Sequence, residues 1–209
     1  MKNRLLASLA ATLVAATSAF ALPTVSFDIV IGESSYGTLG GGAFYANTES
    51  EGVFKTFCIE ANQSIGIGPS DIYVYEWSNA TTYAGNPLSR ATAFLYKSYM
   101  TGALPGYTAT DGNATALQEA LWFLENQNHG VNNAFAQWAV ANVGGDAFAN
   151  ADGEFSVRVM NVYRVGPQGE LLDRQDQIVY APVPDSGSTL VLLGLGLTLV
   201  GAISRRKLL

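Results

Sequence analysis

Cys58, the only cysteine of this chain, is the side chain in the sequence best suited to covalent chemistry. It cannot form a disulfide within the chain, because a disulfide needs two cysteines. In an exported protein such a residue is a small buried hydrophobic group, a reactive thiol, or one end of another covalent bond, and burial is the default. A predicted helix later in the chain carries a carboxamide at Gln118, within the sequence LQEALW.

Residues 57–60, FCIE, and residues 117–122, LQEALW, together resemble a thioester domain of bacterial surface proteins. In that family a cysteine lies in an aromatic-Cys-aliphatic-acid context and a glutamine lies in a Thr-Gln-x-Ala-Ile-Trp motif. Cys58 matches the cysteine, Gln118 matches the glutamine, and Trp122 matches the Trp of the motif. The first position of the motif is Leu rather than Thr here, and the pair is more closely spaced than expected in the longer surface adhesins.

The resemblance implies a bond between the sulfur of Cys58 and the side-chain carbonyl carbon of Gln118. A thiolate is the nucleophile, and the carboxamide is acylated with loss of ammonia. Holding the two groups in contact supplies an effective molarity worth roughly 7–11 kcal/mol. Phe57 and Trp122 would keep water from the thioester until a surface nucleophile of a partner reaches it. The alternative is that Cys58 is a core residue and Gln118 a solvated helix position.

The other polar residues form no recognisable catalytic or metal site. We expect His129, the only histidine, to be a solvated loop residue rather than a general base. One Cys and one His cannot complete a zinc site. Acidic residues such as Glu33 have the spacing of surface residues rather than that of calcium ligands. There is no hydrolase elbow, phosphate loop or nucleotide fingerprint. We therefore expect no metal, no cofactor and no enzymatic activity.

The C-terminal residues 183–209 contain a turn-forming pentapeptide, an apolar run and a basic cluster, in that order. The pentapeptide consists of Val183, Pro184, Asp185, Ser186 and Gly187. The apolar run, residues 190–203, falls short of the roughly 20 residues that span a membrane at full thickness. The basic cluster consists of Arg205, Arg206 and Lys207. Because basic residues stay on the cytoplasmic side, this order predicts a short transmembrane anchor with its tip inside.

This C-terminal segment resembles a PEP-CTERM sorting signal in its VPDSG form. The resemblance implies recognition by an exosortase, an integral-membrane protease-transpeptidase that cuts at the motif and passes the protein onward. The chain would then be anchored transiently in the inner membrane before it reaches the cell surface or the extracellular matrix. A permanent single-pass anchor is the alternative. Such a protein would have a structural or adhesive role, with extracellular polysaccharide among its possible partners.

The N-terminus has the features of a secretory signal peptide. Lys2 and Arg4 form a charged region, residues 5–16 form an apolar core, and Ala19 and Ala21 define an A-x-A cleavage site. The expected organisation is therefore a signal peptide, an extracytoplasmic domain and a sorting signal, at residues 1–21, 22–182 and 183–209. The full chain carries a net charge of −6, and its central part is more acidic than its ends. An acidic domain does not attract nucleic acid.

The central part has strand patterns before and after a group of helix patterns. Alternating apolar residues predict strands at 24–31, 36–46, 53–60, 71–77, 155–165 and 177–182. Helical periodicity predicts helices at 88–100, 113–127 and 131–143, with Leu117, Leu121 and Leu124 on one apolar stripe. This order predicts an α+β fold, an antiparallel sheet or barrel-like domain with a helical insertion. Because Phe57 belongs to the more apolar face of its strand, Cys58 on the opposite face need not point into the core.

Overall fold

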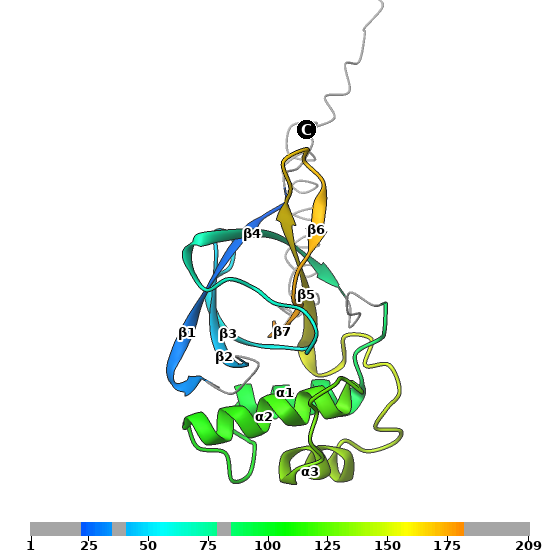
Figure 1. The fold of residues 1–209 in the computed structure, drawn as a ribbon. Helices are drawn as coiled ribbons and strands as arrows, with labels where there is room; N and C mark the ends of the chain where they lie inside the picture. Colours follow the sequence, from blue (N-terminus) through cyan, green and yellow to red (C-terminus); the bar gives the residue numbers. More distant parts are fainter. Residues whose placement is uncertain (1–21, 35–40, 79–84, 182–209) are drawn as a thin grey trace, which may run out of the picture.

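The computed structural model describes residues 22–34, 41–78 and 85–181, in which a β-barrel lies against a layer of helices (Figure 1). The strands are β1 (Thr24–Ser34), β2 (Gly42–Thr48), β3 (Gly52–Cys58), β4 (Gly68–Ser78), β5 (Val157–Val165), β6 (Leu171–Asp173) and β7 (Gln177–Tyr180). The helices are α1 (Arg90–Met100), α2 (Asp111–Leu124), α3 (Ala134–Asn142) and the short 3-10 helix η1 (Glu154–Ser156). The predicted α+β arrangement, with helices inserted between two groups of strands, is confirmed.

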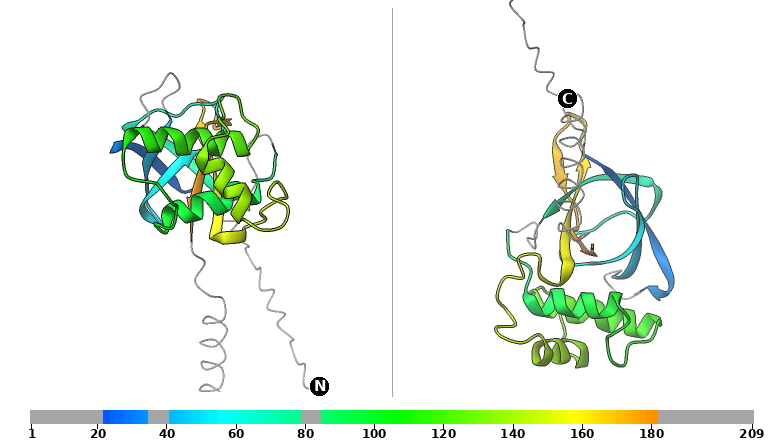
Figure 2. Two further views of the ribbon diagram at one scale, coloured as in Figure 1. Left: turned by 90° about the horizontal axis from the view of Figure 1, so that it is seen from below. Right: turned by 180° about the vertical axis from the view of Figure 1, so that it is seen from behind.

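The strands close into an antiparallel barrel. Their order is β4-β1-β2-β3-β7-β5, and an additional pairing of β4 with β5 completes the ring. Every pairing in this ring is antiparallel. The helices lie across one end of the barrel, as Figure 2 shows from below. Closure leaves side chains pointing either into the barrel or outward, and part of the outer face is covered by helices.

A β-bulge lies between β6 and β7, which pair one after the other with the same side of β5. Tyr163 is opposite Asp173 in β6, whereas Met160 is opposite Gln177 in β7. Two residues on β5 therefore face three residues, 174–176, on the partner side. The extra residue in this segment is the defining feature of a β-bulge, which bends a strand and re-aims its side chains.

The buried residues form two clusters on opposite faces of the barrel wall. One cluster fills the barrel interior and contains Phe27, Tyr75, Cys58, Met160 and Trp122. The other lies between the helices and the outer face of the wall, and it contains the predicted stripe Leu117, Leu121 and Leu124 together with Phe57, Ile59 and Ile178. Because the last residues of β3 are buried on both faces, the expectation that Cys58 need not point into the core is wrong: Cys58 is 0% exposed.

Capping residues place the helix boundaries differently from the periodicity. Ser89 caps α1 by accepting from the N–H of Thr92, so this helix begins later than predicted. Thr110 caps α2 through the N–H of Asn113, so that helix begins earlier and ends at Leu124. Strand β6 was not predicted, because its three residues are too few for an alternating pattern.

The predicted signal peptide and sorting segment lie outside the described residues. Within the described ranges, no helix is long and apolar enough to span a membrane. Glu33, expected at the surface, is instead 5% exposed, because it accepts hydrogen bonds from Lys55 and from the hydroxyls of Tyr99 and Tyr107. This carboxylate ties the barrel strands to the helical layer.

Candidate functional site

Cys58 ends strand β3 with its thiol inside the barrel, at the end covered by the helices. Burial is the main cause that raises the pKa of this thiol to about 12. A hydrogen bond from Gln177 lowers the pKa, and the charge of Glu60 raises it. The resting thiol is therefore protonated at neutral pH. A buried, protonated thiol is a poor nucleophile toward groups in solution, so any reaction must involve a group already beside it.

Gln118 on α2 is 1% exposed, so the interpretation of this residue as a solvated helix position is wrong. Its Oε1 accepts hydrogen bonds from the backbone N–H of Gly42, at 3.3 Å, and of Cys58, at 3.2 Å. Its Nε2 donates to the carbonyl oxygen of Cys58 at 2.6 Å. The carboxamide is thus held between β2 and β3, and the structure brings together the two residues matched by the motif.

Trp122 lies one helical turn after Gln118 and shares its face of α2, because residues four apart on a helix are neighbours. Its ring is 4% exposed and belongs to the barrel-interior cluster that contains Cys58. Gly41 lies against both side chains: a Cβ built there would be 2.7 Å from Gln118 Cγ and 3.2 Å from Trp122 Cη2. The lack of a side chain at this position therefore lets α2 approach the barrel end. The indole Nε1 has no hydrogen-bond partner in the described part of the chain.

Two further glutamines contact the sulfur, and sequence reasoning missed both. The thiol of Cys58 donates to Gln175 Oε1 at 2.9 Å, and Gln177 Nε2 donates to the sulfur at 3.6 Å. Gln175 lies in the β-bulge and is 7% exposed, whereas Gln177 begins β7 and is fully buried. The available signal was the run QDQ directly before an apolar strand, because three polar residues at a strand entry need buried partners if the strand is central.

Two buried carboxyl groups complete this polar cluster. Glu60 Oε2 accepts from the N–H of Asp176 at 3.2 Å, and Asp176 Oδ1 accepts from the N–H of Val162 at 3.1 Å. Gln175 Nε2 donates to the carbonyl oxygen of Glu60 at 2.6 Å. These bonds connect the segment after β3 to the bulge and to β5. The network fixes the position of the bulge relative to Cys58.

The remaining predicted residues lie elsewhere. Phe57 points to the opposite face of β3, where its ring contacts Tyr96 and Tyr99 edge-on. The structure therefore does not bring Phe57 and Trp122 into one pocket. His129 is exposed in the turn after α2, far along the chain from the thiol-bearing strand. Among the described residues, no group of His, Cys, Asp and Glu side chains is arranged to hold a metal ion.

The arrangement around Gln118 is suited to nucleophilic attack on its carbonyl carbon. Two backbone N–H groups point at Oε1, which is where negative charge would develop in a tetrahedral intermediate. These donors come from two paired strands, so they need no reorganisation during a reaction. The same contacts also satisfy a buried polar side chain, which is their structural role.

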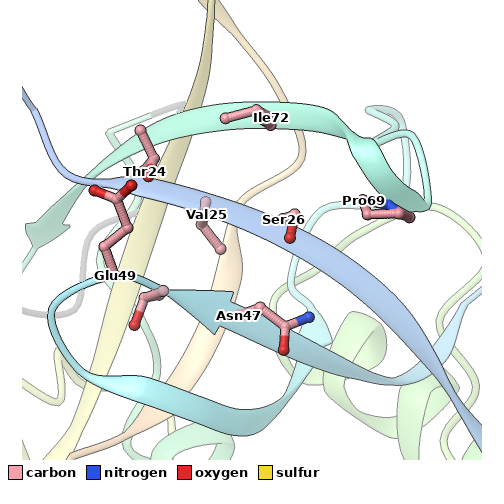
Figure 3. Close-up of a pocket in the computed structure, with 8 residues that line it drawn as sticks. Thr24, Val25, Ser26, Asn47, Glu49, Pro69 and Ile72 are labelled. Atoms are coloured by element: carbon pink, nitrogen blue, oxygen red, sulfur yellow. The ribbon is translucent and has the colours of Figure 1, made fainter.

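Two surface hollows in the described part of the chain lie away from this site. A shallow groove of about 300 Å³ lies between β1, the β2–β3 turn and β4, and Figure 3 shows Thr24, Asn47 and Ile72 on its rim. Another hollow of about 490 Å³ lies between α2 and α3 beside Phe135 and Trp138. Neither is lined by Cys58 or Gln118. Cys58 and Gln118 are themselves buried, and neither of these two hollows exposes them.

Residues 182–207 match the family model described as the VPDSG-CTERM motif. This match supports the PEP-CTERM-type sorting signal predicted from the pentapeptide, the apolar run and the basic cluster. The matched segment lies outside the described residues and covers only the C-terminal end of the chain. No curated protein and no solved structure matches the chain.

Proposed function

We propose that this chain is an exported surface protein that is processed by an exosortase at its VPDSG motif. The observation that carries the proposal is the family match over residues 182–207, which includes the pentapeptide and the basic cluster. The signal-peptide pattern at residues 1–21 points to the same route. The inner membrane and its exosortase are then the first partners. After processing, the acidic barrel domain acts at the cell surface or in the extracellular matrix, in a structural or adhesive role alongside extracellular polysaccharide.

Deletion of residues 183–209 tests the sorting route. The truncated chain should be released to the periplasm or medium, because it lacks both the motif and the apolar run. Fractionation and immunoblotting of cells that carry the exosortase measure this directly. A truncated chain that stays on the surface as before would show that this segment is not the anchor.

Substitution of Pro184 separates cleavage from anchoring. Pro184→Ala leaves the apolar run intact, so the chain should accumulate in the membrane in an uncleaved form. Ser188→Ala, just after the motif, is the matched control and should be processed normally. An unchanged mature mass for Pro184→Ala would argue against cleavage at the motif.

A second candidate function is a reactive thioester module, in which Cys58 and Gln118 form a bond that is later transferred to a surface nucleophile. It is favoured by the hydrogen bonds that place the Gln118 carboxamide on the backbone of Cys58. Burial of both residues favours it as well, because a hydrolysable bond must be kept from water. The two functions are compatible, since sorting delivers the chain to the place where such a bond would be used.

Intact mass tests the thioester. Its formation removes ammonia, so the purified protein should be about 17 Da lighter than the sequence mass, and methylamine should then add to Gln118. Cys58→Ala should lack both the deficit and the methylamine adduct. A wild-type protein at full sequence mass that takes up no methylamine would exclude the thioester and leave the sorting function untouched.

A further inference from the structure

We propose that Gln175 is a positioning residue for the reaction between Cys58 and Gln118, because its hydrogen bond sets the direction of the Cys58 thiol. This inference rests on the proposed thioester. It adds a residue that lies far from the two matched motifs in the sequence. Gln175 reaches the thiol from the β-bulge, on the side of β3 away from β2.

The electrophile is already held in place. Gln118 Oε1 receives two backbone N–H groups, and its Nε2 is bonded to the carbonyl oxygen of Cys58. The carboxamide therefore has little freedom to rotate. What remains to be fixed for a productive encounter is the direction of the thiol.

Gln175 supplies that restraint. A thiol has a single hydrogen, and Cys58 donates it to Gln175 Oε1 at 2.9 Å. Gln175 is in turn held by the bond from its Nε2 to the carbonyl oxygen of Glu60. Both ends of its carboxamide are therefore engaged. Gln177 contacts the sulfur as a donor and at the longer distance of 3.6 Å, so it restrains the thiol less.

The β-bulge explains why Gln175 can reach the sulfur. Its extra residue shifts the register between the pair Tyr163–Asp173 and the pair Met160–Gln177. The N–H of Arg174 donates to the carbonyl oxygen of Val162, which fixes the strand just before the shift. Bulges are frequent next to functional sites because they re-aim single side chains in this way.

The reaction is balanced without an oxidant or a cofactor. The Cys58 sulfur forms a bond to Gln118 Cδ, and the bond from Cδ to Nε2 breaks. The hydrogen of the thiol leaves with the nitrogen, so the released molecule is ammonia. Gln175 is a neutral amide and keeps no proton. Its contribution is to orient the thiol, and misplacement of a reacting group by about 1 Å costs on the order of 100-fold in rate.

The test compares three variants of the full-length protein. Denaturation in concentrated ammonium salt opens any thioester by aminolysis and restores the carboxamide of Gln118. Each protein is then refolded, and the loss of about 17 Da is followed with time by intact mass spectrometry. Gln175→Met removes the acceptor with little change in volume. Gln177→Met is the matched control, a buried glutamine two residues further along the chain that contacts the sulfur only as a donor. Gln175→Glu keeps an acceptor oxygen.

Gln175→Met should form the bond on the order of 100-fold more slowly than wild type, whereas Gln175→Glu and Gln177→Met should stay within about tenfold of it. Stability measured for Gln175→Met in a Cys58→Ala background separates this loss from a folding defect. A wild-type rate in Gln175→Met would overturn the positioning role, and so would an equal loss in Gln177→Met. If Gln175→Met does not refold, Gln175→Glu becomes the test. A Gln175→Glu protein that folds but forms the bond on the order of 100-fold more slowly than wild type would also overturn the positioning role. A wild-type protein that never loses ammonia removes the thioester itself.

Discussion

The two faces of strand β3 lie in cores of different character. Phe57 faces helices whose buried contacts are almost all Leu, Ala and aromatic side chains. Cys58, its neighbour, faces a barrel end where Gln118 and Gln175 are also buried and every one of their carboxamide groups is hydrogen-bonded. An apolar core stabilises through the surface it removes from water, whereas a satisfied polar cluster fixes geometry at little net gain. The comparison teaches that the helical layer is held by apolar burial, whereas the barrel end combines apolar burial with a polar cluster that fixes its arrangement.

The largest effect is expected where the two cores meet. Trp122→Ala should lower the free energy of unfolding by about 3–5 kcal/mol, because it leaves a cavity in the barrel end and uncovers Gln118. Chemical denaturation measures the change. Trp138→Ala, which removes a half-buried ring stacked on Phe94, is the control and should cost less. Equal costs would mean that the barrel end is no better packed than the helical surface.

Removing a polar group from the barrel end should lower the free energy of unfolding by more than the size of the group suggests. Gln118→Leu preserves volume but leaves the N–H of Gly42 and both backbone groups of Cys58 without their partner. The expected loss is about 3 kcal/mol in the same denaturation measurement. Gln127→Leu, at a half-buried position three residues after α2 ends, should lower the free energy of unfolding by under about 1 kcal/mol. A neutral Gln118→Leu would show that these backbone groups find other partners.

The carboxylate that joins the two regions should make stability depend on acid pH. Burial raises the pKa of Glu33, but hydrogen bonds from Lys55, Tyr107 and Tyr99 together lower it by more. The net pKa therefore lies below the ordinary 4.5. The folded state therefore favours the charged form. Its contribution is complete above about pH 4.5 and is lost as the pH falls through the folded value. Between pH 7 and pH 3 the melting temperature should fall less steeply for Glu33→Gln than for wild type. The same pH dependence of the melting temperature in both proteins would contradict this role of Glu33.

The smallest effect is expected at the thiol itself. Cys58→Ala deletes one buried atom and two sulfur contacts, so it should cost only about 1 kcal/mol. In the folded protein without a thioester, iodoacetamide should modify Cys58 far more slowly than in denaturant, because the thiol is enclosed and protonated. Ellman titration of both states gives the comparison. Rapid labelling of the folded form would mean that the barrel end opens readily.

The helical layer was more predictable from sequence than the barrel end. The stripe of Leu117, Leu121 and Leu124 follows directly from helical periodicity, and all three are buried as expected. The approach of Gln118 to Cys58 followed from the motif and not from any local pattern. The contacts of Gln175 could not be predicted, because they depend on a one-residue register shift between two strands that no periodicity encodes. The buried state of Glu33 was missed for a similar reason, since its partners come from three separate segments.

Closure of the barrel affects how one copy of this chain could pair with another. Each strand of the ring has a neighbour on both sides over part of its length, which leaves less free backbone for another chain to pair with than an open sheet does. Among the described strands, β6 is the one outside the ring, and Figure 1 shows it projecting from the barrel on the β5–β6 hairpin. It is three residues long, ends at Asp173 and is followed by Arg174, and short, charged edges discourage strand-to-strand aggregation. Closure of the ring therefore limits strand addition between copies of this chain.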